Sequence, residues 1–232
     1  MTFQMIIQKL NLIFAIVKGM SMKTSLYSIG HGHKSIEEFI EELNSFEISY
    51  LIDVRTVPYS KWNPEFNQET LKRDLNSYCQ IKYDWWGNPE SDSYIGGRPL
   101  STECLDDDGF FDYKEMAKDY RFKRGLERLV LASENGLRVA LMCSESNPSE
   151  CHRSKLIGRE LYFQYKINMR HIIDVSKSIS EVDVIRGLCR GWEPNSLFSD
   201  QPEPYFKSRK SYKSTIQLSF QYDTEFYTIG SY

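Results

Sequence analysis

The chain has 232 residues, of which 41% are hydrophobic and 26% are charged, and its 29 basic and 32 acidic side chains give a formal net charge of −3. This balance excludes collagen-like, low-complexity and fully disordered chains. The mild acidity also argues against a protein that coats nucleic acid through excess positive charge. A chain of this length forms one large domain, or one domain with a tail.

Residues 1–22 are predicted to be an N-terminal extension. Residues 5–17 are apolar, but Gln8, Lys9 and Asn11 interrupt the run, and it is too short to span a bilayer. The five cysteines have irregular spacing and no Cys-x-x-Cys pair, which is typical of reduced thiols rather than of disulfides. We therefore expect a cytoplasmic protein with no membrane segment.

Short apolar runs alternate with helical patterns from about residue 25 onward. Residues 25–29 predict a strand, and Ser35 with Glu38 three positions later predicts a capping box at the start of a helix. Further strands are expected at residues 50–54, 80–83, 137–143 and 171–175. Further helices are expected at residues 68–78, 113–134, from about 151 onward and at 181–188, and a long loop at 84–112.

This alternation predicts an α/β fold. The central strands are apolar on both faces, which is typical of a mostly parallel sheet with helices on both faces. A single domain is expected over residues 23–190. Residues 191–232 are predicted to be a linker and an aromatic-rich tail, in which residues 214–228 could form a hairpin.

Three of the predicted strands end in residues that can carry chemistry. These ends are Gly30-His31-Gly32-His33, Asp53-Val54-Arg55, and Cys143-Ser144-Glu145 followed after a short loop by Cys151-His152-Arg153. Ligands of open parallel sheets bind beyond the carboxyl ends of the strands. If the three strands are neighbours, one cleft should be lined by His31, Arg55, Cys143, Glu145 and Arg153.

The candidate catalytic residues are two thiols, two imidazoles and one carboxylate, namely Cys143, Cys151, His31, His152 and Glu145. A thiol near a helix start and an arginine has a lowered pKa, so Cys151 should react faster than Cys143, which ends a buried strand. Ser149 stands where the Cys-x5-Arg loop of cysteine phosphatases would have arginine. The structural alternatives are a buried core thiol at Cys143 and a loop histidine bonded to a neighbouring strand at His31.

The candidate substrate-binding residues are Arg55, Arg153, Asp53, Gly30, Gly32 and Trp86. The arginines would hold an anion, the glycines would let the backbone approach a ligand, and Trp86 would stack on a planar group. Asp53 would orient a histidine or an arginine. The structural alternatives are ion pairs for Asp53 and Arg153 and a core-capping ring for Trp86.

Several motifs occur in a characteristic order: Tyr27-Ser-Ile-Gly-His-Gly-His33, Leu51-Ile-Asp-Val-Arg55 with Pro58, Asn63-Pro-Glu-Phe66, Ile95-Gly-Gly97, and Cys143-x-Glu145 followed by Cys151-His-Arg153. In this combination the chain resembles the Domain of Unknown Function 488 family over about residues 24–175. The resemblance implies an α/β domain of cytosolic microbes and implies no activity, because the family has no general assigned reaction. A fainter similarity, to rhodanese-like and cysteine phosphatase folds, rests on the early Asp-Val-Arg strand end and the later strand-borne cysteine.

These residues favour an enzyme that acts on an anionic substrate, such as a nucleotide or a nucleic-acid component, as a hydrolase or a transferase. A binding module that holds a nucleotide or a nucleic-acid end without turnover is the second hypothesis. The third is a metal site of Cys143, Cys151, His152 and His31, whose spacing matches no common zinc motif. The preferred hypothesis has no cofactor and no metal, and its partners are a small anionic ligand or nucleotide, with nucleic acid as a further candidate.

Overall fold

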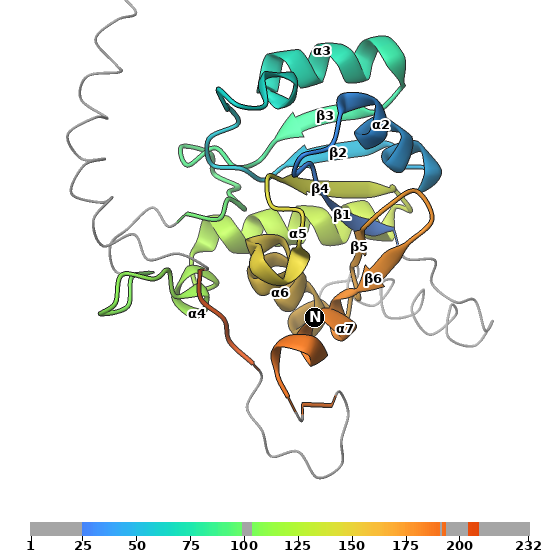
Figure 1. Ribbon diagram of the computed structural model, residues 1–232. Helices are drawn as coiled ribbons and strands as arrows, with labels where there is room; N and C mark the ends of the chain where they lie inside the picture. Colours follow the sequence, from blue (N-terminus) through green and yellow to red (C-terminus); the bar gives the residue numbers. More distant parts are fainter. Residues whose placement is uncertain (1–24, 99–103, 191, 194–203, 209–232) are drawn as a thin grey trace, which may run out of the picture.

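The computed structural model describes residues 25–98, 104–190, 192–193 and 204–208. At its centre is a six-stranded sheet in the order β3-β2-β4-β1-β5-β6 (Figure 1). The strands are β1 (Leu26–Gly30), β2 (Tyr50–Asp53), β3 (Lys82–Trp85), β4 (Val139–Cys143), β5 (Arg170–Ile172) and β6 (Ser178–Ser180). All pairs are parallel except β5 with β6 at the edge. The predicted α/β fold with a mostly parallel sheet is confirmed.

Helices cover both faces of the sheet (Figure 1). One face carries α2 (Ile36–Ser45) and α3 (Gln68–Tyr78), and the other carries α5 (Tyr120–Glu134) and α6 (Arg159–Tyr165). The shorter helices and turns are η1 (Pro64–Phe66), α4 (Tyr113–Met116), η3 (Pro148–Glu150), η4 (Arg153–Gly158) and α7 (Glu181–Leu188). Along β4, Ala140 and Met142 belong to the core under α2 and α3, whereas Leu141 and Cys143 belong to the core under α5 and α6. This alternation follows from the two-residue period of a strand.

Several helix boundaries agree with the sequence patterns. At the start of α2, Ser35 Oγ accepts from the Glu38 amide at 3.2 Å, and Glu38 Oε2 accepts from the Ser35 amide at 2.8 Å. This is the predicted capping box. The bounds of α3 and α7 match the predicted 68–78 and 181–188.

The helix predicted over residues 113–134 is wrong in one respect, because the structure has two helices there. α4 ends at Met116, and α5 begins at Tyr120. The Asp119 side chain accepts from the Arg121 amide at 2.8 Å, so Asp119 caps a new helix rather than continuing the old one. As a result Tyr120, which the helical pattern places on the buried face, is 63% exposed.

Two strand predictions are shifted. β3 covers residues 82–85 rather than 80–83, and β5 covers residues 170–172 rather than 171–175. After β5 the chain turns, with the Ile173 amide bonded to the Lys177 carbonyl at 2.9 Å, and returns as β6. No sequence pattern predicted β6, because three residues are too few to show a period.

Residues 204–208, inside the predicted linker, pack back onto the domain. The Ser208 amide donates to the Phe111 carbonyl at 3.0 Å, and Ser208 Oγ accepts from the Phe111 amide at 2.9 Å. The folded unit therefore includes this part of the linker. The predicted extension at 1–22 and the hairpin or tail at 214–228 lie outside the described residues. Within the described ranges, no helix has the length and apolar character needed to cross a bilayer.

Candidate functional site

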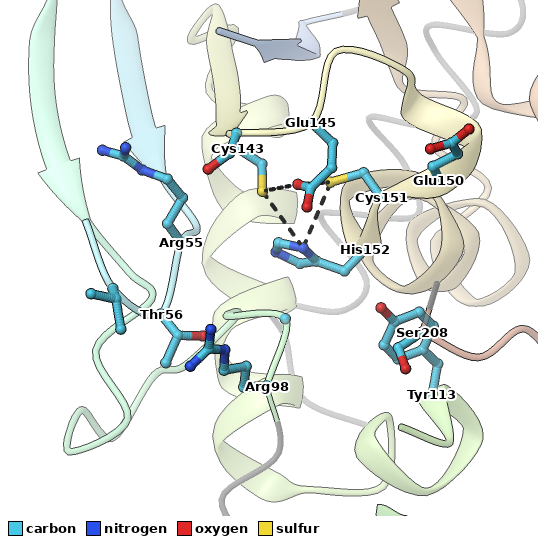
Figure 2. A pocket seen from close by; sticks show the side chains of 13 residues that line it. Arg55, Thr56, Arg98, Tyr113, Cys143, Glu145, Glu150, Cys151, His152 and Ser208 are labelled. Carbon is cyan, nitrogen blue, oxygen red and sulfur yellow. Dashed lines mark hydrogen bonds between the residues drawn. The ribbon is translucent and has the colours of Figure 1, made fainter. Parts of the chain in front are cut away.

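A cavity of ≈ 270 Å³ lies at the carboxyl edge of the sheet, next to the ends of β2 and β4 (Figure 2). Its walls come from the end of β2, from the loop at Gly97 and Arg98, and from the segment that follows β4, and it is completed by Tyr113 and Ser208. Small-molecule pockets usually measure roughly 300–1,000 Å³. The cavity therefore suits a compact ligand.

The strand register explains why distant motifs meet here. β4 lies between β1 and β2, with Gly30 paired to Cys143 and Asp53 paired to Met142. Because all three strands are parallel, their carboxyl ends lie at the same edge. The expectation that these strands are neighbours is confirmed.

Four side chains from the end of β4 and the segment after it gather on the cavity wall (Figure 2). We call Cys143, Glu145, Cys151 and His152 the thiol cluster. Cys143 Sγ donates to Glu145 Oε2 at 3.0 Å and lies 3.9 Å from His152 Nδ1. Cys151 Sγ lies 3.6 Å from Glu145 Oε2 and 3.7 Å from His152 Nδ1. Both cysteines are buried, with 5% and 2% of their surface exposed. Two sulfur atoms, an imidazole nitrogen and a carboxylate therefore share one small volume.

The His152 ring is held in one orientation. Its Nε2 lies 3.2 Å from the Val54 carbonyl oxygen, which can only accept a hydrogen bond, so Nε2 carries the proton. In the neutral ring, the lone pair of Nδ1 then faces the two sulfur atoms. A Cβ atom on Gly97 would lie 2.6 Å from this Nδ1, so glycine at position 97 makes room for the ring.

Arg153 lies behind the thiol cluster and does not line the cavity. Its side chain is fully buried. Nε donates to Cys151 Sγ at 3.2 Å, Nη1 donates to Ser28 Oγ at 3.2 Å, and Nη2 donates to the Glu145 carbonyl. The prediction that Arg153 lines the cleft is therefore wrong, because its donors face the protein interior.

A series of hydrogen bonds between buried polar side chains, here called the buried polar chain, holds Arg153 in place. Ser28 Oγ contacts His171 Nδ1 at 2.7 Å, His171 Nε2 contacts Glu181 Oε2 at 2.7 Å, and all three residues are 0% exposed. Arg153 starts η4, a π-helix, and such turns occur frequently at functional sites. Gly158 in η4 leaves room for Glu181, since a Cβ atom there would lie 2.2 Å from Glu181 Oε2.

The two thiols of the cluster have opposite pKa shifts. Hydrogen bonding to Cys151 and burial raise the pKa of Cys143 well above its ordinary value. Burial also raises the pKa of Cys151, but the hydrogen bond from Cys143 and the charge of Arg153 outweigh burial, and the pKa of Cys151 falls well below its ordinary value. Cys151 is therefore the more acidic thiol of the pair.

We expect iodoacetamide to modify Cys151 faster than Cys143 in chelator-treated protein, because the thiolate is the nucleophilic form. Mass-spectrometric mapping after brief treatment measures both rates in one sample. Cys79 and Cys189, whose pKa values burial raises, serve as slow references. Equal and slow modification of Cys143 and Cys151 would show that neither thiol is activated.

Gly30 and Gly32 face the loop that follows β4. A Cβ atom on Gly30 would lie 2.0 Å from the Glu145 carbonyl oxygen, and one on Gly32 would lie 2.0 Å from Ser146 Oγ. Gly32 also has a φ of +53°, which disfavours other residues. The close approach that the glycines were expected to offer a ligand is thus made by the loop after β4.

His31 belongs to the opposite side of the sheet from the thiol cluster. Its ring stacks on Phe66 with 4.4 Å between ring centres, and Phe66 is part of the core under α2 and α3. The prediction that His31 lines the cleft is wrong, because Gly30 is level with Cys143 and the next residue points to the other face. Its Nδ1 lies 3.2 Å from the Gly32 carbonyl, and its Nε2 has no hydrogen-bond partner among the described residues.

The burial of His31 should make folding stability depend on pH. Burial, followed by the charge of Arg55, lowers the pKa of His31 to about 4. The ordinary histidine value is about 6.5, so the contribution to stability is fully present above pH ~6.5 and is lost as the pH falls towards 4. At about 1.4 kcal/mol per pKa unit, the loss could reach about 3 kcal/mol.

Urea unfolding at several pH values measures this loss. His31→Phe keeps a ring against Phe66 and removes the titrating group, so it should flatten the pH dependence between pH ~6.5 and 4. A variant with the same decline as the wild type would assign the effect to another group.

Asp53 and Arg55 form an ion pair inside the protein. Arg55 Nε donates to Asp53 Oδ1 at 3.0 Å, and Arg55 Nη2 donates to Asp53 Oδ2 at 2.6 Å and to the Phe66 carbonyl at 2.7 Å. Tyr83 donates to the same carboxylate at 2.8 Å. Arg55 lines the cavity, but its guanidinium points away from the thiol cluster and is neutralised by Asp53 (Figure 2).

Trp86 lies outside the cavity. It is 8% exposed, its Nε1 donates to Asp84 Oδ2 at 2.6 Å, and the Arg128 guanidinium lies 3.6 Å from its ring centre. Arg128 therefore covers the ring face that was expected to stack on a ligand.

The cavity also has wall residues that were not among the predicted site residues: Thr56, Val57, Gly97, Arg98, Tyr113, Ser144, Glu150 and Ser208. Arg98 lies across the cavity from Cys151 (Figure 2). Its position directly after the glycine pair of Ile95-Gly-Gly97 is the sequence feature that could have identified Arg98 as a site residue. Ser208 gave no signal, because it belongs to a segment with linker composition.

Comparison with models of known protein families identifies the family of the chain. The family model for "Domain of unknown function DUF488" matches residues 35–159, which is more than half of the 232 residues. No curated protein and no solved structure matches the chain. The matched range contains β2, β4 and the whole thiol cluster. The chain therefore belongs to the Domain of unknown function DUF488 family.

Proposed function

We propose that this protein is a cytoplasmic enzyme that acts on a small anionic substrate of the nucleotide type, with the thiol cluster as its reactive centre. The observation that carries the proposal is the convergence of two thiols, an imidazole lone pair and a carboxylate on one cavity wall. The thiols are buried and have pKa values shifted in opposite directions. Such perturbed groups in a cleft are typical of active sites.

Arg98 is the residue that would bind the anionic group. Arginine offers a planar set of donors that fits phosphate and carboxylate oxygens. Arg55 contributes less, because Asp53 already neutralises it, and Arg153 is buried behind Cys151. We therefore assign the anion-binding role expected for Arg55 and Arg153 to Arg98, which lines the cavity across from Cys151.

The thiol cluster would carry the reaction. In a metal-free site the Cys151 thiolate is a nucleophile, and His152 Nδ1 is a proton acceptor 3.7 Å from it. If a metal ion occupies the cluster, the sulfur atoms become ligands instead. Both forms of the site support hydrolysis or group transfer on a substrate held by Arg98.

Isothermal titration calorimetry with AMP, ADP and inorganic phosphate tests the anion site. Arg98→Ala should weaken binding by roughly 10- to 100-fold, because a hydrogen bond to a charged group contributes about 1.5–3 kcal/mol. Arg124→Ala is a matched control, since Arg124 is an exposed arginine outside the cavity. Absence of binding, or equal affinity in Arg98→Ala and the wild type, would contradict the proposed anion site.

Product analysis separates an enzyme from a binding module. The wild type should convert one of a panel of mononucleotides, and Cys151→Ser should abolish conversion while leaving the Arg98 contact in place. Mass spectrometry of the reaction mixture detects the product. Binding without conversion by the wild type would favour the binding module, which uses the same cavity without turnover.

A further inference from the structure

We propose that the thiol cluster is a zinc site, in which Cys143, Cys151 and His152 bind Zn²⁺ and Glu145 occupies the fourth position until a ligand from the cavity displaces it. This zinc site depends on the proposed function only because both use the same cavity. Zinc binding itself requires no particular substrate. The ligand atoms of the two cysteines and the histidine lie within 4.8 Å of one another, and all three residues are buried.

The distances within the thiol cluster match the edges of a zinc tetrahedron. With Zn–S near 2.3 Å and Zn–N or Zn–O near 2.0–2.1 Å, a tetrahedral site has S–N and S–O edges of about 3.5–3.6 Å. The two S–N distances are 3.9 and 3.7 Å, and the Cys151 Sγ to Glu145 Oε2 distance is 3.6 Å. A further edge, from Cys143 Sγ to Glu145 Oε2, is 3.0 Å and is a direct hydrogen bond. Zinc binding would release that proton and lengthen the edge by about half an ångström.

His152 is already oriented as a metal ligand. Its Nε2 donates to the Val54 carbonyl, which directs the Nδ1 lone pair at the sulfur atoms. Zinc-binding histidines almost always donate their other ring N–H to an oxygen in this way. This orientation of His152 requires glycine at position 97, because the Cβ atom of any other residue would collide with the ring.

The charge balance also fits a divalent cation. Two thiolates and one carboxylate carry three negative charges, which Zn²⁺ and one guanidinium would neutralise. Arg153 supplies that guanidinium, since it is fully buried and donates to Cys151 Sγ at 3.2 Å. Two buried thiolates without a metal ion would be energetically unfavourable.

The donor set selects zinc over harder ions. Two thiolates and an imidazole suit Zn²⁺, whereas Mg²⁺ and Ca²⁺ prefer oxygen ligands. All four members of the thiol cluster line the cavity, so the ion would be open to a ligand there, as in catalytic zinc sites. The spacing Cys143-x-Glu145 and Cys151-His152 contains no Cys-x-x-Cys pair, which explains why the sequence shows no common zinc motif.

Zinc would also supply the positive charge that an anionic substrate needs. Glu145 and Glu150 line the cavity together with Arg98, while Arg55 is neutralised by Asp53. An anion would therefore meet little excess positive charge in the metal-free cavity. A bound Zn²⁺ acts as a Lewis acid that polarises a substrate oxygen or lowers the pKa of a bound water.

Metal analysis and a zinc titration of the full chain test the proposal. Protein purified under reducing conditions from zinc-supplemented cells should contain one zinc per chain. After treatment with chelator, titration against a chromogenic zinc indicator gives the affinity. Cys143→Ser, Cys151→Ser and His152→Ala should each weaken zinc binding by at least about 100-fold, which is more than the loss expected for outer residues. Cys79→Ser and Cys189→Ser are matched controls outside the thiol cluster and should bind zinc like the wild type.

Gly97→Ala tests the geometry while leaving every ligand in place. Its Cβ atom would displace the His152 ring, so zinc affinity should fall by roughly 10- to 100-fold, as it does for other changes around zinc ligands. Cobalt substitution adds a spectroscopic readout, because thiolate-to-cobalt charge-transfer absorption appears only if sulfur binds the metal. Wild-type affinity in Gly97→Ala would contradict the proposed position of the ion.

A measurement on the wild type covers the case in which ligand variants fail to fold. Zinc should slow alkylation of Cys143 and Cys151 and leave Cys79 and Cys189 unaffected. Equal rates with and without zinc, or zinc binding that survives replacement of both cluster cysteines, would overturn the proposal. Nucleotide binding is measured separately by calorimetry. Zinc binding without nucleotide binding would support the zinc site and refute the proposed function. Nucleotide binding without zinc binding would support the proposed function and refute the zinc site.

Discussion

Glu181→Ala should lower the free energy of unfolding by about 2–6 kcal/mol, because two buried hydrogen-bonding partners would each lose their acceptor at a cost of about 1–3 kcal/mol. Glu181 is 0% exposed, contacts His171 Nε2 at 2.7 Å and accepts from Ser154 Oγ at 3.0 Å. Alanine would leave both partners buried without an acceptor. Because His171 contacts Ser28, which in turn accepts from Arg153, the loss should also loosen the support behind Cys151.

Urea unfolding followed by circular dichroism measures the effect of Glu181→Ala. Glu134→Ala is the matched control, because Glu134 is exposed on α5 and a surface change of this kind usually stays within about 0.5 kcal/mol. If the two variants are equally stable, the buried polar chain does not hold the domain together.

Gly30→Ala should destabilise the protein by about 1–3 kcal/mol, the usual cost of forcing extra volume into a packed region. The new Cβ atom would lie 2.0 Å from the Glu145 carbonyl oxygen and 2.9 Å from the Ser146 Cα, both backbone atoms that cannot rotate away. The loop after β4 would have to move, and Glu145 would move with it. The variant should therefore also lose affinity for zinc.

Gly187→Ala provides the opposite case for the same substitution. A Cβ atom there would meet nothing within 4 Å, and the residue lies in α7. Alanine should therefore raise stability by about 0.5–1 kcal/mol through its better helix propensity. Thermal unfolding of the two variants side by side gives both signs, and a stable Gly30→Ala protein would mean that the loop after β4 can adjust freely.

The arrangement of the site was predictable wherever it follows from strand topology. Parallel β1, β2 and β4 place their carboxyl ends at one edge, so motifs centred on Gly30, Asp53 and Cys143 had to meet. The capping box of α2 was predictable for a similar reason, since it depends on only two side chains three positions apart. The capping box follows from a local rule and the meeting of the strand ends from a topological rule, and each rule allows few alternative structures.

What could not be predicted is the direction in which individual side chains point. Arg153 directly follows His152 in sequence, and His31 directly follows Gly30, which pairs with Cys143. Nevertheless His31 points to the other face and Arg153 lies behind Cys151. Arg153 is the first residue of the π-helix η4, and no sequence pattern predicts such a turn. The direction of a charged side chain depends on partners such as Ser28 that are distant in sequence.

The glycine motifs also have a physical explanation that the sequence alone left open. Gly30 and Gly32 accommodate the loop after β4, and Gly97 accommodates the His152 ring. Each glycine thus leaves the space that a residue of another motif needs in order to pack against it. This mutual dependence explains why the motifs occur together around a single cavity.

A crystal structure of the full chain, grown with zinc and ADP and measured at the zinc absorption edge, tests the central claim most directly. We predict one strong anomalous peak bonded to Cys143, Cys151 and His152, and phosphate density between that peak and Arg98. An ADP molecule ordered elsewhere on the protein, together with a cavity that holds neither zinc nor phosphate, would contradict the account.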